Sequence, residues 1–186
     1  MKEKIIEESI LLFERKGFSE TSIQDIVEAI GVTKGTFYYY FSSKEQLLMD
    51  IHLGYIDDLL ERQAAIHKTA ASNQQKLKQM VQLLIADIKD HGPSGRVFFR
   101  EMRHLAEDNA GAVKAKREEF RINIENLLTE GIEEGEFRKD IKPDMTAFAV
   151  LGITNWSYQW FNPAGEVSAE SLAEIYSDLI LNGIAQ

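Results

Sequence analysis

The residues best suited to chemistry lie in the segment GVTKGTFYYYF, which runs from residue 31 to residue 41. It combines two glycines, two threonines and one lysine with three consecutive tyrosines. Each tyrosine hydroxyl would need a hydrogen-bond partner inside a core, and so short a segment cannot bury all three rings. Exposed hydroxyls and an ammonium group suit hydrogen bonding to phosphate oxygens and base edges. The chemistry expected here is therefore recognition rather than catalysis.

The sequence lacks the residue patterns that catalysis or metal binding would need. It has no cysteine, which excludes disulfides and thiolate sites. Its four histidines are scattered and show no zinc-binding spacing. No Ser/His/Asp order or glycine-rich phosphate loop stands out. We therefore expect a protein that is not an enzyme and that binds neither a metal nor a cofactor.

The overall charge does not by itself favour a nucleic-acid partner. The 186 residues are 44% hydrophobic, enough for one sizeable domain or for a small module joined to a larger one. The formal net charge of -9 argues against general polyanion binding. From residue 31 to residue 44, however, there are two lysines and no acid. Any nucleic-acid interpretation therefore depends on helix geometry.

Two stretches bear on the location of the protein. The N-terminal stretch MKEKIIEESILLFERKGF has charges among its apolar residues, unlike a signal peptide. The longest uncharged run, 145–165, contains Asn155, Gln159 and Pro163, so we expect a buried helix there and no membrane span. These features predict a cytoplasmic protein.

Apolar residues recur at spacings of three and four, which predicts an all-α fold with about nine helices. Three short helices are expected within the first 43 residues, and a long fourth helix should run from Lys44 into the 60s. Glycine, proline and asparagine predict further breaks at 91–95, 109–111, 135 and 162–165. This uneven spacing predicts a small domain of residues 1–45 and a larger domain of residues 46–186.

The stretch ETSIQDIVEAIGVTKGTFYYYFSSKEQLL contains the signals of three helix starts. Thr21 with Gln24 and Ser42 with Glu45 each fit a capping box. Thr33 is expected to be the N-cap of the helix between them. The pattern predicts a helix, a tight turn and a second helix.

The tyrosines can be placed on this second helix because successive residues advance by about 100°. Gly31 is expected to end the preceding helix in a left-handed conformation. If Phe37 points inward, Tyr39 lies about 160° away and faces outward. Gly35 shares this outward face, although glycine costs a helix about 1 kcal/mol relative to alanine. Something should therefore need close approach to this face.

A DNA major groove would explain the exposed glycine, because the helix backbone could then approach the bases. Lys34 and Thr36 would offer donors to base edges, and the tyrosine hydroxyls would reach phosphates. Lys44, in the first turn of the next helix, would add a cation for an anion. The alternative is a small aromatic core with amphipathic edges.

The stretch GFSETSIQDIVEAIGVTKGTFYYYFSSKEQLL resembles the helix-turn-helix signature of the TetR family of bacterial transcriptional regulators. The resemblance covers about residues 3–50. It implies an N-terminal helix-turn-helix domain followed by a larger helical domain for ligand binding and dimerisation. One departure is Tyr40, which stands where many members have histidine. By this resemblance the DNA-contacting positions are Thr21, Ser22, Gln24, Thr33, Lys34, Gly35, Thr36, Tyr38, Tyr39, Tyr40 and Lys44.

A single short recognition helix reads too few base pairs to find one genomic site. A twofold dimer would place two such helices in successive major grooves of a near-palindrome. The expected last helix, Ser168–Gly183, carries an apolar stripe suited to a homodimer interface, and the preceding helix, Pro143–Phe161, is apolar nearly all round. The alternative for the stripe is intrachain core. The expected interface residues are Leu172, Ile175, Tyr176, Leu179 and Ile180.

The segments RVFFREMRHL and GITNWSYQWF combine large rings with polar groups, which suits a ligand pocket or, alternatively, aromatic core or dimer contacts. Arg96, Arg100 and Arg103 form a basic stripe that would suit a ligand with an apolar tail and an anionic head, or would pair with neighbouring acids. The expected ligand-binding residues are Phe98, Phe99, Arg100, Met102, Arg103, Asn155, Trp156, Gln159 and Trp160.

The C-terminal part resembles TetR-family regulators of fatty-acid and sterol catabolism, several of which respond to acyl-CoA thioesters. This resemblance implies a transcriptional repressor that is released from its DNA operator by a hydrophobic small-molecule inducer, with an acyl-CoA as the first candidate. A hydrophobic drug is the alternative inducer. A helical adaptor that binds protein partners is the alternative function, and the salt dependence of DNA binding separates the two.

Overall fold

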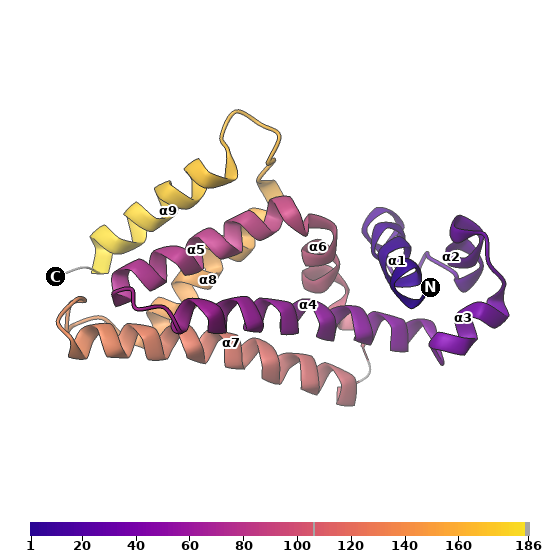
Figure 1. The fold of residues 1–186 in the computed structure, drawn as a ribbon, viewed down its shortest axis with the longest axis horizontal. Helices are drawn as coiled ribbons and strands as arrows, with labels where there is room; N and C mark the ends of the chain where they lie inside the picture. Colours follow the sequence, from indigo (N-terminus) through magenta and orange to yellow (C-terminus); the bar gives the residue numbers. More distant parts are fainter. Residues whose placement is uncertain (106, 185–186) are drawn as a thin grey trace. The chain divides into compact units, whose positions relative to one another are not determined.

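The structure, a computed structural model, describes residues 1–105 and 107–184 (Figure 1). All the secondary-structure elements of these described residues are helices, so the predicted all-α fold with about nine helices is confirmed. The elements are α1 (Lys2–Lys16), α2 (Ile23–Ile30), α3 (Lys34–Tyr40), α4 (Lys44–His67), α5 (Asn73–Asp90), α6 (Gly92–Glu101), the 3-10 helix η1 (Met102–His104), α7 (Glu107–Glu133), α8 (Pro143–Trp160) and α9 (Ala169–Ile184).

The predicted break at 109–111 is wrong, because α7 runs through Gly111 without interruption. The break signal there was a glycine near an asparagine, and a helix interior tolerates one glycine at a modest cost. The predicted break at 91–95 falls at His91, and Gly92, Pro93 and Gly95 form the first turn of α6 instead. Proline is compatible with a first turn because it has no N–H to leave unpaired there.

The chain forms two compact units. Unit 1 comprises Met1–Asp57 and Pro93–Lys114, and unit 2 comprises Asp58–Gly92 and Ala115–Gln186. Helix α4 contributes to both, with its first part in unit 1 and its last part in unit 2. The predicted division into a helix-turn-helix domain of residues 1–45 and a larger domain of residues 46–186 stays a prediction.

Unit 1 is built around aromatic and aliphatic side chains from short helices. Helix α2 packs against both α1 and α3. Phe13, Phe37 and Phe41 are fully buried, together with Ile5 and Ile26. Since α3 has only seven residues, its own hydrogen bonds cannot stabilise it in water, and this buried cluster supplies the stability it needs.

The caps of α2 and α4 differ from the prediction by one residue each. Ser22, not Thr21, is the N-cap of α2, and it forms a reciprocal capping box with Asp25. Thr21 is unavailable because its hydroxyl lies 2.8 Å from the carbonyl oxygen of Gly17. At the start of α4, the backbone N–H of Gln46 donates to the Ser43 hydroxyl at 3.0 Å, so Ser43 takes the capping position predicted for Ser42.

Two other predicted features of the helix-turn-helix are confirmed. The Thr33 hydroxyl accepts from the backbone N–H of Thr36 and caps α3. Gly31 ends α2 with φ 70 and ψ 38, the left-handed conformation. Its N–H and that of Val32 return to carbonyl groups of the last turn, which closes α2 before α3 begins.

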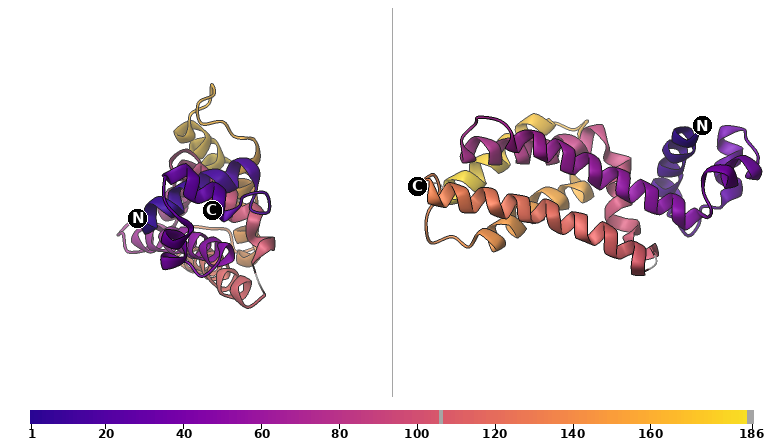
Figure 2. Two further views of the ribbon diagram at one scale, coloured as in Figure 1. Left: turned by 90° about the vertical axis from the view of Figure 1, so that its right-hand side faces the viewer. Right: turned by 60° about the horizontal axis from the view of Figure 1, so that its bottom comes forward.

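Unit 2 is organised around α5, which packs against both α8 and α9 (Figures 1 and 2). The start of α5 is held by Glu136, whose carboxylate accepts from the backbone N–H groups of Asn73 and Gln74, each at 2.9 Å. Burial raises the pKa of Glu136, but these hydrogen bonds outweigh it and lower the pKa below its usual value. Gly131 is required nearby, because a Cβ there would lie 2.2 Å from the Phe137 ring.

Among the described residues, none of the helices combines the length and the apolar character that a bilayer crossing needs. Helix α8, which holds most of the long uncharged run, instead buries one of its faces in unit 2 through Ala147, Val150 and Tyr158.

Replacing Gly31 by alanine should lower the free energy of unfolding by about 1–2 kcal/mol, because a side chain is strained in the left-handed conformation. The space around the new Cβ is open, so strain alone should set the cost. Gly54→Ala is the matched control: it lies inside α4 with open space around its Cβ and should gain about 0.5–1 kcal/mol. Urea denaturation measures both. A Gly31→Ala protein as stable as the unmodified chain would contradict the assigned turn.

Candidate nucleic-acid interface

Helix α3 presents its tyrosines to solvent in the order that helical geometry predicts. Phe37 is fully buried, whereas Tyr39 is 81% exposed. Tyr38 and Tyr40 lie between these extremes, at 54% and 37%. The rings of Tyr39 and Tyr40 pack edge to face at 4.8 Å between centroids, and Tyr38 packs in the same way on Phe37. The tyrosines therefore form an exposed surface whose rings are held by contacts with one another and with Phe37.

The remaining exposed positions of α3 leave its backbone accessible. Gly35 is exposed, and a Cβ added there would come no closer than 3.5 Å to another atom, the Thr33 hydroxyl oxygen. The fold does not need a glycine at this position. Lys34 is also exposed, and the hydroxyl of Thr36 lies 3.2 Å from that of Thr33. This face can donate hydrogen bonds while a partner approaches the helix closely.

The first turn of α2 adds two exposed polar residues, Ser22 and Gln24. The Gln24 amide donates to the carboxylate of Glu28. Hydrogen bonds from the side chain and the backbone of Ser22, with a smaller contribution from Lys16, lower the pKa of Asp25 to about 2. The capping carboxylate is therefore ionised at neutral pH, and the α2 start is fixed by charge-assisted hydrogen bonds.

Two residues expected to contact DNA have other roles in the structure. Thr21 is fully buried, and its hydroxyl lies against the carbonyl groups that end α1. The Lys44 ammonium donates to the carbonyl oxygens of Phe18 and Thr21, at 2.7 and 2.6 Å. The sequence places a cation at this helix start, but tertiary folding directs it inward.

The part of the predicted ligand site on α6 lies in unit 1. Phe98 is buried, with its ring centroid 4.8 Å from that of Tyr55 and 5.4 Å from that of Phe99. Both Phe99 and Met102 are half-buried. Phe98 is therefore a core residue of this unit.

The basic stripe of α6 binds α1 in unit 1. The Nη2 atom of Arg100 donates to the carbonyl oxygens of Phe13 and Glu14, at 2.5 and 2.9 Å. The guanidinium of Arg96 pairs with the Glu14 carboxylate. That Arg100 binds a ligand anion stays a prediction, and in this structure its Nη2 donors are taken by two carbonyl groups of the last turn of α1, one of which, that of Phe13, also accepts the N–H of Gly17.

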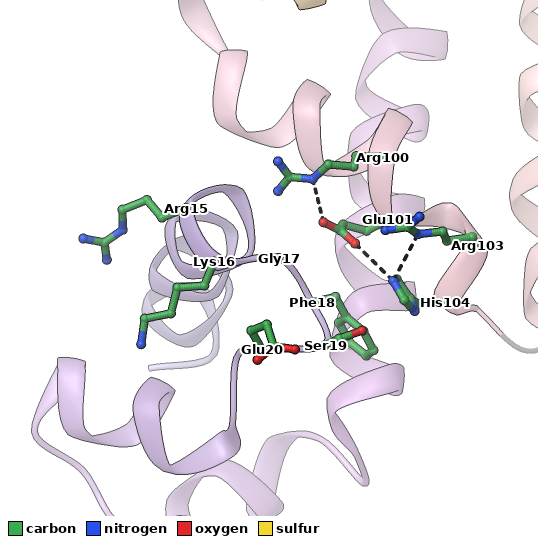
Figure 3. A pocket seen from close by; sticks show the side chains of 10 residues that line it. All are labelled: Arg15, Lys16, Gly17, Phe18, Ser19, Glu20, Arg100, Glu101, Arg103 and His104. Atoms are coloured by element: carbon green, nitrogen blue, oxygen red, sulfur yellow. Dashed lines mark hydrogen bonds and ion pairs between the residues drawn. The ribbon is translucent and has the colours of Figure 1, made fainter.

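Arg103 lies beside a cleft of about 380 Å³ in unit 1, between the end of α1 and the α6–η1 junction (Figure 3). Its Nε atom lies 3.3 Å from Nε2 of His104. Glu101, which is buried in the wall, lies 2.7 Å from Arg100 and 3.4 Å from His104. The cleft mixes both charges, and within its lining the Glu101 carboxylate pairs with Arg100 and His104.

The other part of the predicted ligand site, on α8, lies in unit 2. Trp156 is 67% exposed and Trp160 is also exposed, as is Gln159. Asn155 is half-buried. Rings at the surface do not line an enclosed cavity of one chain, so the structure favours the alternative that these tryptophans form a contact surface.

Helix α9 has two apolar faces instead of one stripe. Leu172 and Ile180 are buried in unit 2, whereas Ile175 and Leu179 are 56% and 62% exposed. The Tyr176 hydroxyl lies 3.0 Å from that of Ser157 on α8. The predicted interface set therefore divides: Leu172 and Ile180 belong to the intrachain core, and the exposed pair is left for a partner.

Sequence reasoning missed a polar group inside unit 2. Gln63 is fully buried; its amide donates to the carbonyl oxygen of Phe120 at 2.9 Å, and its own carbonyl accepts from Asn123 at 2.8 Å. The available signal was spacing, because Gln63 follows the buried Leu59 by four residues in α4. A polar residue at a core position of a helix indicates a specific internal partner.

A second missed group surrounds Asp87, which is fully buried. It accepts from Tyr158 at 2.7 Å, from His91 at 2.9 Å and from Arg62, and so joins α5 to α8 and α4. Possible ligand atoms of Asp58, Asp87 and His91 lie within 4.8 Å of one another. Arg62 binds both carboxylates and already supplies the positive charge that a metal ion would bring.

Comparison with known proteins matches two parts of the chain to described families. Residues 5–51 match "Bacterial regulatory proteins, tetR family", a segment that runs from within α1 through α2 and α3 into the start of α4. Residues 70–184 match "Tetracyclin repressor-like, C-terminal domain". The two matches together include most of both units.

Individual relatives extend over nearly the whole chain. The HTH-type transcriptional repressor KstR2 of Rhodococcus jostii is 28% identical over 98% of this chain and 90% of its own length. The structure of the ketosteroid transcriptional regulator KstR2 of Mycobacterium tuberculosis superposes with a TM-score of 0.91 and 25% identity, covering 100% of this chain and 95% of that one. AibR, solved with isovaleryl coenzyme A and operator DNA, shares the fold at a TM-score of 0.86 and 24% identity, covering 96% of each chain.

Proposed function

The chain belongs to the TetR family of bacterial regulators, whose members bind DNA and are not enzymes, and we propose from this that it represses transcription. In this proposal it binds a near-palindromic operator as a homodimer in the bacterial cytoplasm. A hydrophobic small molecule then releases it.

The observation that carries the DNA-binding part is the exposed outer face of α3. Gly35 permits the helix backbone to approach the floor of a major groove, and Lys34 has the donors that guanine O6 and N7 accept. The hydroxyls of Tyr38 and Tyr39 suit phosphate oxygens without adding charge. The proposed contact set is completed by Tyr40, by Ser22 and Gln24 at the start of α2, and by Thr33 and Thr36.

The homodimer part is supported by the exposed apolar residues of α8 and α9. Trp156, Trp160, Ile175 and Leu179 are each more than half exposed in the single chain. Large exposed apolar side chains on neighbouring helices mark an interaction surface. A second copy of the chain is the partner we propose, because a twofold dimer also supplies the second recognition helix that operator selectivity needs.

For the inducer we propose an acyl-CoA thioester. The support is the similarity to repressors named KstR2, one of which is called a ketosteroid regulator, and the fold shared with AibR, which was solved with isovaleryl coenzyme A. A neutral or cationic hydrophobic drug is the alternative ligand. Because binding is reciprocal, a ligand that weakens operator binding must itself bind the free protein more tightly than the DNA-bound protein.

Lys34→Met should weaken operator binding and relax base preference at one position of each half-site, by about 1–3 kcal/mol. Because the homodimer loses two cations, one from each subunit, the slope of log affinity against log salt should also fall by about 1.8. Fluorescence anisotropy with a selected operator, at several salt concentrations, measures both. Lys68→Met, an exposed lysine beyond the end of α4, is the control and should leave both values unchanged. If the unmodified protein binds no DNA in this titration, the adaptor function is favoured.

Leu179→Glu should convert the dimer to a monomer, because an unpaired carboxylate would be buried in the proposed interface. Operator affinity should then fall by at least about tenfold, since each subunit would bind one half-site alone. Sedimentation velocity gives the oligomeric state. Leu11→Glu, an exposed leucine of α1, is the control and should remain dimeric. A dimeric Leu179→Glu protein would show that α9 is not the interface.

A long-chain acyl-CoA at one hundred times its dissociation constant should stabilise the DNA-free protein by about 2.7 kcal/mol and lower its operator affinity. Free CoA and the free fatty acid, each at the same concentration, should stabilise the protein less and weaken operator binding less, because each lacks one part of the ligand. Calorimetry and anisotropy on the same samples provide the two values. Stabilisation by hydrophobic drugs but not by acyl-CoA would replace the proposed ligand class with the alternative one.

A further inference from the structure

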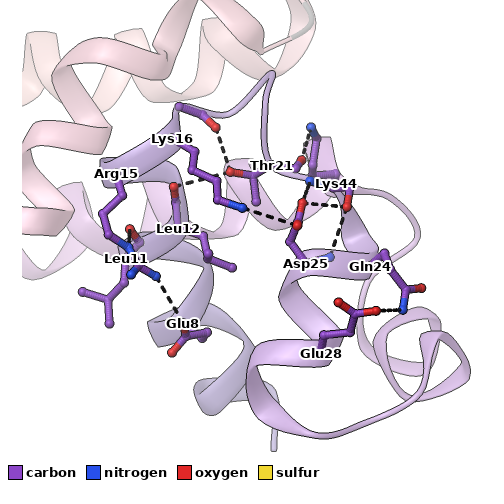
Figure 4. A network of polar contacts seen from close by, with 12 residues as sticks. Glu8, Leu11, Leu12, Arg15, Lys16, Thr21, Gln24, Asp25, Glu28 and Lys44 are labelled. Atoms are coloured by element: carbon purple, nitrogen blue, oxygen red, sulfur yellow. Dashed lines mark hydrogen bonds and ion pairs between the residues drawn. The ribbon is translucent and has the colours of Figure 1, made fainter.

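The contacts of Lys44 differ from those expected of a phosphate-binding lysine. Its Nζ atom donates to the carbonyl oxygen of Thr21 at 2.6 Å (Figure 4). It also donates to the carbonyl oxygen of Phe18 at 2.7 Å and lies 4.3 Å from the centre of the Phe18 ring. An ammonium group has three donors, and the two carbonyls use two of them. We call this set of contacts the Lys44 bridge.

The bridge holds the turn that links α1 to α2. This turn follows Gly17, whose φ of 86 ends α1, and continues to Thr21 immediately before α2. The Thr21 hydroxyl binds back to the carbonyl oxygen of Gly17 at 2.8 Å, while its own carbonyl accepts from Lys44. One residue therefore links the end of α1, the start of α2 and the start of α4.

The Lys44 side chain is in a partly desolvated position. Burial lowers the pKa of Lys44, although the negative charges of Glu20 and Asp25 act in the opposite direction. Moving the ammonium outward to a phosphate would require both carbonyl contacts and the ring contact to be broken. The carbonyls would then lose a charged donor.

We propose that Lys44 is a positioning residue for DNA binding and that its ammonium does not contact a phosphate. This inference rests on the proposed function. The bridge ties the α1–α2 turn, which ends next to the N-cap of α2, to the first residue of α4, and α3 lies between α2 and α4 in the sequence. With Phe37 buried and both neighbouring helices linked, α3 keeps its outer face and the α2 start in one fixed arrangement before DNA arrives.

The test compares Lys44→Met with Lys34→Met in the full chain, by operator titrations at several salt concentrations. For Lys44→Met we expect operator affinity to fall by about tenfold or more while the salt slope stays that of the unmodified protein. Hydrogen exchange at the amides of Thr21 and Ser22 should also become faster in the free variant. An unchanged affinity, or a slope reduced by about 1.8 (about 0.9 for the lysine of each subunit) with unchanged exchange, would overturn the proposal.

A measurement on the unmodified protein does not depend on whether the variant folds. Nitrogen-15 NMR of lysine side chains reports each ammonium group separately. The Lys44 signal should be the same in the free and operator-bound protein, whereas the Lys34 signal should shift. A Lys44 signal that shifts with DNA as much as that of Lys34 would contradict the bridge. If the unmodified protein bound no DNA, the proposed function would fail, and the exchange data on the free chain would still test the bridge.

Discussion

The burial of Phe37 is the constraint on which the candidate interface depends. A seven-residue helix has too few hydrogen bonds to persist alone, so its orientation is set by the side chain it buries. Once Phe37 is inside, helical geometry requires Tyr39 and Gly35 to face solvent. The exposed surface is therefore a consequence of the core, and the Thr33 cap and the Gly31 turn fix where that helix begins.

The parts of the site that could be predicted from sequence are those determined locally. The positions of Phe37 and Tyr39 follow from an angle per residue, and Gly31 follows from the conformation a turn needs. The α2 cap could not be chosen locally, because Thr21 and Ser22 are adjacent and both can cap a helix. A tertiary contact determines which residue caps α2. The Thr21 hydroxyl hydrogen-bonds to the Gly17 carbonyl oxygen at the end of α1, and Ser22 is therefore the N-cap.

Charged residues were the least predictable for the same reason. Arg100 and Lys44 both have long cationic side chains that the sequence suggested were available to a ligand or to DNA. In the structure Arg100 binds a backbone carbonyl at the end of α1, and Lys44 binds carbonyls of the α1–α2 turn. The α9 stripe was recognised as apolar, but its division into a buried face with Leu172 and an exposed face with Leu179 depends on where α5 and α8 lie. Composition and periodicity carry no information on such partners.

The open space around Gly35 has an evolutionary consequence. Its nearest neighbour would allow a methyl group without strain, so folding imposes no requirement on the residue there. Selection against a methyl group at this position would therefore act through the molecule that α3 meets and not through folding. Paralogues can therefore acquire new target sequences by substitution at a site where the protein scaffold is indifferent to the change.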